Sequence, residues 1–184
     1  MNLRDEFQPD LLQLEVLHAR ALPSARLQAV HDLCRRAYGE DLADYFAALT
    51  DGVHVLGFLD GILASHAMWV TRWLQAGVGP LLRTAYVEMV ATEPAYQGRG
   101  LGRAVMRRLA AEITAYDLGA LCPAETSLYG HLGWIPWRGP LYIRTETGLL
   151  PTPEEAVMVL PTPRTPALDL ELPLSAEWRA IELW

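Results

Sequence analysis

The chain is 184 residues long, which suits one domain with a sizeable core and is too short for two domains of ordinary size. Half of the residues are hydrophobic and a fifth are charged, a globular composition that excludes a disordered or fibrous protein. Acidic residues number 22 and basic residues 15, so the net charge of −7 disfavours nucleic acid and favours cationic partners.

The first predicted element is an amphipathic helix over residues 23–38, in which the apolar residues at helical spacing are Leu27, Val30, Leu33, Cys34 and Ala37. A second, short helix is expected over residues 41–49. Two apolar runs separated by Asp60 and Gly61 then predict two antiparallel strands, because an Asp-Gly pair favours a tight hairpin turn. A loop over residues 76–80 leads to a central strand that ends at Pro94.

Another amphipathic helix is predicted over residues 101–116, with apolar residues on one face and arginines on the other. Beyond it we expect a strand over 118–122, a short helix over 126–132 and strands over 140–144 and 156–160. Pro173 and the prolines before it predict an extended, irregular C-terminal arm. This order predicts a single α/β domain over residues 1–184 with a mixed sheet.

The sequence shows no signal for export, membrane insertion or metal binding. Its first residues, MNLRDEFQPD, are too acidic and polar for a signal peptide, and no apolar run approaches the ~20 residues that span a bilayer. The two cysteines, Cys34 and Cys122, lie far apart and outside any zinc-ligand spacing, which predicts free thiols. We therefore expect a cytoplasmic protein without a metal.

The most specific local pattern is a glycine-rich turn, QGRGLG, between the central strand and the second amphipathic helix. Its glycines allow the backbone to approach a ligand closely, and the following helix adds the positive end of its dipole. A pyrophosphate fits such a turn, with Arg99 and Arg103 as additional cations. The spacing excludes a P-loop and the dinucleotide fingerprint. The alternative is a turn that only packs a strand against a helix.

This turn resembles the acetyl-CoA motif of the GNAT acyltransferases, Gln/Arg-x-x-Gly-x-Gly/Ala, here Gln97, Gly100 and Gly102. Further segments resemble one GNAT branch, the aminoglycoside 2′-N-acetyltransferases, over nearly the whole chain: AYGED, YVEMVA, LGAL, SLYGHLGWIPWRGP, TPEEAVMVLP and WRAIELW. The chain departs from that pattern where Cys122 replaces a Ser and where Glu replaces Asp near Glu154 and Glu182. The segments before Tyr129 and after Pro153 are also shorter.

The resemblance implies the GNAT fold, a mixed and mostly antiparallel central sheet flanked by helices, with an extended C-terminal arm. It also implies acetyl-CoA as co-substrate, transfer of acetyl to the 2′-amine of an aminoglycoside with antibiotic resistance as the result, and a homodimer. Two alternatives stay open. The acceptor is another small amine or a peptide N-terminus, or the chain is a silent GNAT-like module that binds CoA or a cationic ligand without turnover.

The resemblance also assigns roles to residues. Glu88 is expected to accept the proton of an acceptor ammonium through water, the alternative being a solvated or salt-bridged side chain. The N–H groups of Met89 and Val90 are expected to bind the thioester carbonyl oxygen if the strand is bulged there. Tyr129 is expected to protonate the departing thiolate, the alternative being a core tyrosine.

Two residue sets follow for the substrates. The acetyl-CoA set is Met89, Val90, Gln97, Gly98, Arg99, Gly100, Leu101 and Gly102. A polycationic acceptor needs converging carboxylates, and its set is Asp41, Glu88, Cys122, Glu154 or Glu155, Glu182 and the terminal carboxylate of Trp184. A nucleophilic role for Cys122 is the rival chemistry, disfavoured because no histidine or basic cluster adjoins it in sequence. His66 and His131 lack ligand spacing and are interpreted as ordinary polar or core residues.

Overall fold

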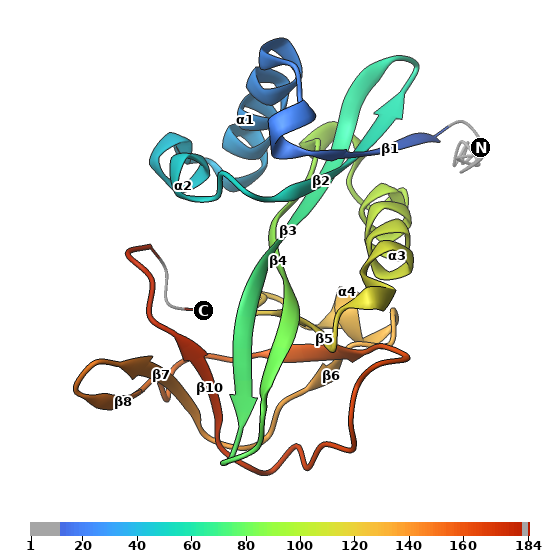
Figure 1. Ribbon diagram of the computed structural model, residues 1–184. Helices are drawn as coiled ribbons and strands as arrows, with labels where there is room; N and C mark the ends of the chain where they lie inside the picture. The colour runs from blue at the N-terminus through green and yellow to red at the C-terminus, as the bar shows by residue number, and fades with distance from the viewer. Residues whose placement is uncertain (1–11, 182–183) are drawn as a thin grey trace. The chain divides into compact units, whose positions relative to one another are not determined.

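The computed structural model of the chain describes residues 12–181 and residue 184 (Figure 1). Their backbone forms two compact units, of which the first comprises residues 12–68 and Met89–Leu109 and the second Trp69–Glu88, residues 110–181 and Trp184. The strands β3 (Ile62–Ala76) and β4 (Leu81–Thr92) contribute residues to both units. No helix in the described part of the chain is long and apolar enough to cross a membrane.

The first unit contains the two predicted N-terminal helices, α1 (Ser24–Tyr38) and α2 (Ala43–Ala48). Helix α1 buries Val30, Leu33 and Cys34, as the apolar spacing predicts, and it ends at a left-handed Gly39. Strand β1 (Leu12–His18), which the sequence analysis missed, pairs antiparallel with β2 (Val53–Leu59) along its whole length. The short 3-10 helix η2 (Ala19–Ala21) follows β1.

The hairpin predicted at Asp60 and Gly61 is confirmed, since both residues have positive φ, 52° and 78°, and join β2 to β3. Strand β3 runs on to Ala76, beyond the predicted apolar run. After β4 come the 3-10 helix η3 (Pro94–Tyr96) and helix α3 (Leu101–Glu112), whose buried residues are Leu101, Val105, Met106 and Leu109. The predicted end of α3 is the separate 3-10 helix η4 (Ile113–Ala115).

The second unit is built on the strand order β6-β9-β5-β4-β3-β10-β7-β8 (Figure 1). The elements not yet bounded are β5 (Leu118–Leu121), α4 (Ser127–Gly130), β6 (Ile135–Pro136), β7 (Leu141–Thr145), β8 (Gly148–Pro151), β9 (Met158–Pro161) and β10 (Leu174–Glu177). The pairs β4–β5 and β7–β10 are parallel, whereas β3–β10, β5–β9, β6–β9 and β7–β8 are antiparallel. The expected mixed, mostly antiparallel sheet is confirmed.

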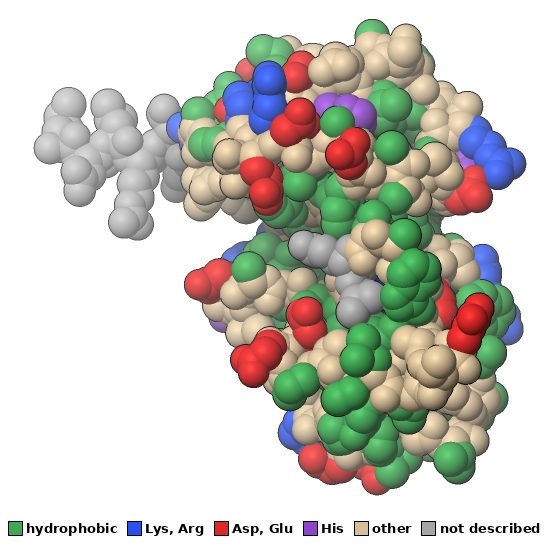
Figure 2. Space-filling view, turned by 90° about the vertical axis from the view of Figure 1, so that its left-hand side faces the viewer, with side chains coloured by type: hydrophobic (Ala, Val, Ile, Leu, Met, Phe, Trp, Pro, Cys, Tyr) green, Lys and Arg blue, Asp and Glu red, His purple; other side chains and the backbone are tan. Residues whose placement is uncertain are grey.

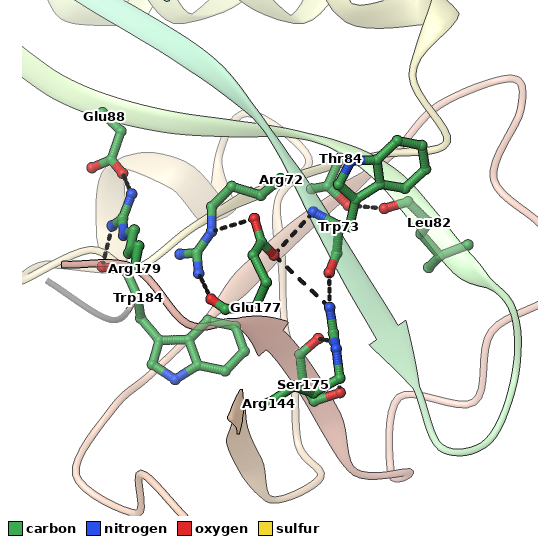
Figure 3. Close-up of polar contacts among 10 residues, drawn as sticks. All are labelled: Arg72, Trp73, Leu82, Thr84, Glu88, Arg144, Ser175, Glu177, Arg179 and Trp184. Atoms are coloured by element: carbon green, nitrogen blue, oxygen red, sulfur yellow. Dashed lines mark hydrogen bonds and ion pairs between the residues drawn. The ribbon is translucent and has the colours of Figure 1, made fainter. Parts of the chain in front are cut away.

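The C-terminal arm is not irregular throughout, which corrects the prediction made from its prolines. Strand β10 lies inside the sheet between β3 and β7, with Leu174 and Ala176 fully buried. Its Glu177 carboxylate accepts a hydrogen bond from the Trp73 N–H at 3.1 Å, and its Glu177 carbonyl accepts one from buried Arg72 at 2.8 Å (Figure 3). These contacts fix a strand that is too short and too close to Pro173 to be recognised from its sequence.

Two buried histidines distinguish the interior of the first unit. His54 is 2% exposed and His66 is fully buried. Desolvation by burial, with a smaller contribution from neighbouring histidines, lowers the pKa of His54 to about 4 and that of His66 to about 3. Both rings are therefore neutral in the folded protein at any pH near neutrality.

We predict that this pair destabilises the protein in mild acid. The unfolded histidines take up protons near their ordinary pKa of 6.5, whereas the folded ones do so only near 4 and 3. Protons therefore favour the unfolded state as the pH falls through this window, at ~1.4 kcal/mol per pH unit for each histidine. Urea unfolding at several pH values measures this slope. His54→Asn/His66→Asn should flatten it, whereas His131→Asn at an exposed position should not; equal slopes in all three proteins would contradict the prediction.

Candidate active site

The backbone of β4 departs from extended geometry at Met89, which has a φ of 52°. Asp60, in the β2–β3 turn, is the other described non-glycine residue with positive φ. A left-handed conformation costs a residue with a side chain about 1–2 kcal/mol, so neighbouring contacts must hold it. The local irregularity required for the expected role of Met89 and Val90 is therefore present in the strand.

Two side chains hold the carbonyl groups of this segment. The Met89 oxygen accepts a hydrogen bond from His66 Nδ1 at 2.8 Å, and the Val90 oxygen accepts one from the Tyr38 hydroxyl at 3.0 Å. The described peptide bonds are all trans, so the Val90 N–H points opposite to the Met89 C=O and away from His66. Strand β4 pairs with β5 from Thr84 to Tyr86, and this pairing ends before Met89.

The glycine-rich turn lies in the same unit, immediately before α3. Gly98 and Gly100 have φ values of 77° and 87°, a region that other residues rarely adopt, and a Cβ at either would meet no atom within 4 Å. The turn is thus open to a ligand. A Cβ at Gly102 would lie 3.1 Å from Thr92 Oγ1, so this glycine lets the first turn of α3 approach β4.

The remaining residues of the turn support its shape. The Gln97 side chain donates to the Thr92 carbonyl at 3.3 Å, and the Arg99 guanidinium lies 5.4 Å from the centre of the Tyr96 ring. Leu101 is buried and begins α3, which leaves the first N–H groups of the helix without partners inside the helix. Such groups bind anions such as phosphates.

In the second unit, Tyr129 lies on α4 and is half-buried. Its ring contacts Trp134 edge-on, with centroids 6.3 Å apart and an interplanar angle of 78°. Burial raises the pKa of Tyr129 to about 12, so the hydroxyl keeps its proton at neutral pH. A proton donor must satisfy this condition.

Glu88 forms the salt bridge that the sequence analysis held as the alternative. Its carboxylate is bound by Arg179 Nη1 at 2.6 Å, and the two side chains are 9% and 14% exposed (Figure 3). Arg179 Nη2 also donates to the main-chain oxygen of Trp184 at 3.1 Å. The Trp184 ring is buried, and its indole N–H donates to Thr152 Oγ1 at 2.7 Å. The structure therefore brings Glu88 and Trp184 together around one guanidinium.

Arg179 is the site residue that the sequence reasoning missed. The signal that could have found it is an arginine within the apolar WRAIELW segment, since a cation enclosed by apolar residues needs an anionic partner. Its guanidinium also lies 5.5 Å from the centre of the Tyr86 ring, two residues from Glu88 on β4.

Two other candidate acceptor residues, Cys122 and Asp41, have hydrogen-bond partners of their own. The Cys122 thiol donates to Glu155 Oε2 at 3.2 Å, and both Glu154 and Glu155 are exposed. Asp41 belongs to the first unit, where its carboxylate accepts a hydrogen bond from the Ala43 N–H at 3.1 Å before α2. Glu182 lies outside the described residues. On the face shown in Figure 2, acidic side chains lie among exposed hydrophobic ones.

Within the described residues, no group of three or more His, Cys, Asp and Glu side chains is arranged to hold a metal ion.

The open turn generates a prediction for Gly100→Val. The new side chain forces a β-branched residue into a φ of 87° and occupies the space in front of the turn. We expect a sharp rise in the dissociation constant for acetyl-CoA, measured by calorimetry. Gly61→Val is the matched control, because Gly61 has a φ of 78° and equally open space but lies in the β2–β3 turn. If both variants bind acetyl-CoA equally well, the turn does not bind it.

The environment of Tyr129 generates a prediction for the variant Tyr129→Phe. Tyr129→Phe keeps the ring against Trp134 and removes only the proton donor, so binding of both substrates should persist while turnover falls by ~10²–10⁴-fold, as for loss of a general acid. Tyr142→Phe, which removes a hydroxyl from β7, is the control. Wild-type turnover of Tyr129→Phe under conditions where chemistry limits the rate would show that another group donates the proton.

Comparisons with known proteins identify the family and the fold. Residues 18–136 match the family described as "Acetyltransferase (GNAT) domain". The chain is 36% identical over 149 residues to an aminoglycoside 2′-N-acetyltransferase of Mycolicibacterium fortuitum, a match that covers 77% of this chain and 75% of that protein.

Solved structures share the fold. YhbS of Escherichia coli, a GNAT family N-acetyltransferase solved in complex with CoA, matches with a TM-score of 0.62 and 17% identity over 91% of this chain and 89% of its own. Eis1 of Mycobacterium abscessus matches 67% of this chain with a TM-score of 0.57 and 22% identity, and there the match spans 31% of the longer chain. By its family match and its fold, the chain belongs to the GNAT family and is an acetyltransferase.

Proposed function

We propose that this acetyltransferase transfers acetyl from acetyl-CoA to the 2′-amine of an aminoglycoside, and that it thereby confers antibiotic resistance. The observation that carries the proposal is a nearly buried carboxylate, Glu88, that already binds a cation. The relationship to an aminoglycoside 2′-N-acetyltransferase supports the same acceptor. The net charge of −7 also favours a polycationic substrate.

The Arg179 guanidinium supports an acceptor group that is itself a cation. A guanidinium and an ammonium are both cations that donate hydrogen bonds to a carboxylate, so an acceptor ammonium can take the place of Arg179 at Glu88. An uncharged acceptor would leave Glu88 bound to Arg179 and gain nothing from the carboxylate. The site therefore favours amines that are protonated when they bind.

In the proposed reaction, Glu88 accepts a proton from the bound ammonium, directly or through water, because only the neutral amine is a nucleophile. The amine nitrogen attacks the thioester carbonyl carbon, and the Val90 N–H stabilises the negative charge that develops on the carbonyl oxygen. The C–S bond then breaks, and the CoA thiolate takes the proton of Tyr129. The nitrogen loses its second proton as the amide forms, which restores the Tyr129 hydroxyl directly or through water, and Glu88 releases the first proton to solvent. No covalent enzyme intermediate is needed, which leaves Cys122 without a catalytic role.

The test is a thiol-release assay on pairs of aminoglycosides that differ only in carrying an amine or a hydroxyl at the 2′ carbon. We expect turnover for the amine and none for the hydroxyl, with the acetyl group located on the 2′ nitrogen by NMR of the product. Equal turnover of both members would show that another amine is acetylated. Acetyl-CoA binding without turnover of any acceptor would instead support a silent module. The homodimer and the cytoplasmic location stay predictions, which sedimentation and cell fractionation test.

The variant Glu88→Gln distinguishes two roles for Glu88, as the base that accepts a proton or as a charge that binds the substrate. If Glu88 is the base, this variant loses most activity near neutral pH and least at high pH, where more of the acceptor amine is already neutral, with a loss of ~10²–10⁴-fold at neutral pH. Glu171→Gln is the control, since it neutralises an exposed carboxylate that also pairs with an arginine, Arg138. A pH–rate profile lowered uniformly would mean that Glu88 acts only by its charge on substrate binding.

A further inference from the structure

The first unit contains a hydrogen-bonded chain of two histidines that ends on the backbone of β4. His54 Nδ1 lies 2.9 Å from His66 Nε2, and His66 Nδ1 lies 2.8 Å from the Met89 carbonyl oxygen. From its sequence context alone, His66 is interpreted as an ordinary polar or core residue. Its contacts show more than that, because it is fully buried and its hydrogen bond goes to the one described residue of β4 with a positive φ.

The contacts define where the protons lie. A carbonyl oxygen can only accept, so His66 Nδ1 carries the hydrogen that it donates to Met89. His66 is neutral, since burial holds its pKa far below neutrality, and its Nε2 therefore has no proton. Nε2 must then accept from His54 Nδ1, which fixes the tautomer of His54 as well. Both hydrogen bonds are therefore donated toward Met89: His54 donates to His66, and His66 donates to the Met89 carbonyl oxygen.

The hydrogen bond from His66 acts on the peptide that joins Met89 to Val90. Because C=O and N–H of a trans peptide point in opposite directions, a hydrogen bond that holds the Met89 oxygen toward β3 also holds the Val90 N–H away from β3. The left-handed φ of Met89 disfavours this orientation unless something compensates for it. His66 supplies such a compensation on one carbonyl, and Tyr38 supplies another on the next.

We propose that the buried His54–His66 pair positions the Met89–Val90 peptide, so that the Val90 N–H stays aimed at the thioester carbonyl oxygen. The hydrogen bond from His66 to Met89 is observed in the structure, whereas its role in catalysis rests on the proposed function. His66 is a positioning residue, because it touches the backbone that contacts the substrate and not the substrate itself. His54 acts one step further away by fixing the His66 tautomer.

The experiment compares His66→Leu with His66→Asn. Leucine removes the donor, whereas the asparagine amide nitrogen occupies nearly the position of Nδ1 and can still donate to Met89. For His66→Leu we expect kcat to fall by ~10–100-fold, as for a misplaced oxyanion donor, with the acetyl-CoA dissociation constant little changed. His66→Asn should recover most of kcat. His31→Leu is the control, since His31 is a histidine of the same unit whose ring stacks on Phe46 and whose Nε2 is buried without a hydrogen-bond partner.

A readout independent of turnover is the infrared stretching frequency of acetyl-CoA labelled with ¹³C at the thioester carbonyl. A well-aimed N–H polarises that carbonyl and lowers its frequency, so His66→Leu should raise the frequency and His66→Asn should restore it. If His66→Leu keeps both the wild-type frequency and the wild-type kcat, or if His66→Asn is as impaired as His66→Leu, the positioning role is wrong.

NMR of the wild-type protein without any substrate separates this inference from the proposed function. The ¹⁵N shifts of the imidazole rings should show a protonated Nδ1 on both His54 and His66, and the Val90 amide resonance should move in His66→Leu but not in His31→Leu. These results can hold even if no aminoglycoside is acetylated. A proton on His66 Nε2 of the wild-type protein would overturn the proposal even if His66→Leu failed to fold. In folded His66→Leu, an unmoved Val90 amide would overturn it even if the enzyme stayed active.

Discussion

The irregular backbone at Met89 is the constraint on which the proposed chemistry depends. A regular strand commits every N–H and C=O to one of its two edges in strict alternation. A left-handed residue interrupts that alternation and turns one peptide out of its usual orientation. The resulting N–H can serve a ligand, but only while the strain at Met89 is offset. The hydrogen bonds from His66 and Tyr38 provide that offset, so residues distant in sequence determine how one amide points.

A second constraint lies in the second unit, where the Glu88 carboxylate has little access to solvent and needs a cation. An unpartnered buried charge costs several kcal/mol, and Arg179 meets that requirement for Glu88. Strand β10 makes this possible, because Glu177 ties it to β3 and β7 through Trp73, Arg72 and Arg144 only two residues before Arg179 (Figure 3). The terminal segment thus follows a strand whose place is fixed.

Periodicity and turn chemistry were enough to predict the elements that carry strong local signals. Helices α1 and α3, the Asp60–Gly61 hairpin and the central strand β4 were found this way, and motif resemblance supplied the family. Strands β1 and β10 were missed because a short strand receives its stability from pairing with segments distant in sequence, which local patterns do not encode. For the same reason Arg179 and the role of His66 were missed. The Arg179–Glu88 ion pair joins residues 91 positions apart, and His66 binds the Met89 backbone, and neither contact produces a periodic pattern in the sequence.

The Glu88–Arg179 pair also changes how acceptor affinity should be understood. In the proposed function, binding of an ammonium at Glu88 is an exchange, in which the carboxylate gives up the Arg179 guanidinium before it gains the substrate cation. The free energy of binding therefore contains the difference between two charge-assisted hydrogen bonds and not the whole of one. A monoamine gains little from such an exchange. A polyamine gains more, because its other ammonium groups can bind further carboxylates that Arg179 does not occupy, and the released guanidinium can pair with an acid elsewhere. Selection for polycations then arises from the exchange itself, without a pocket shaped to reject smaller amines.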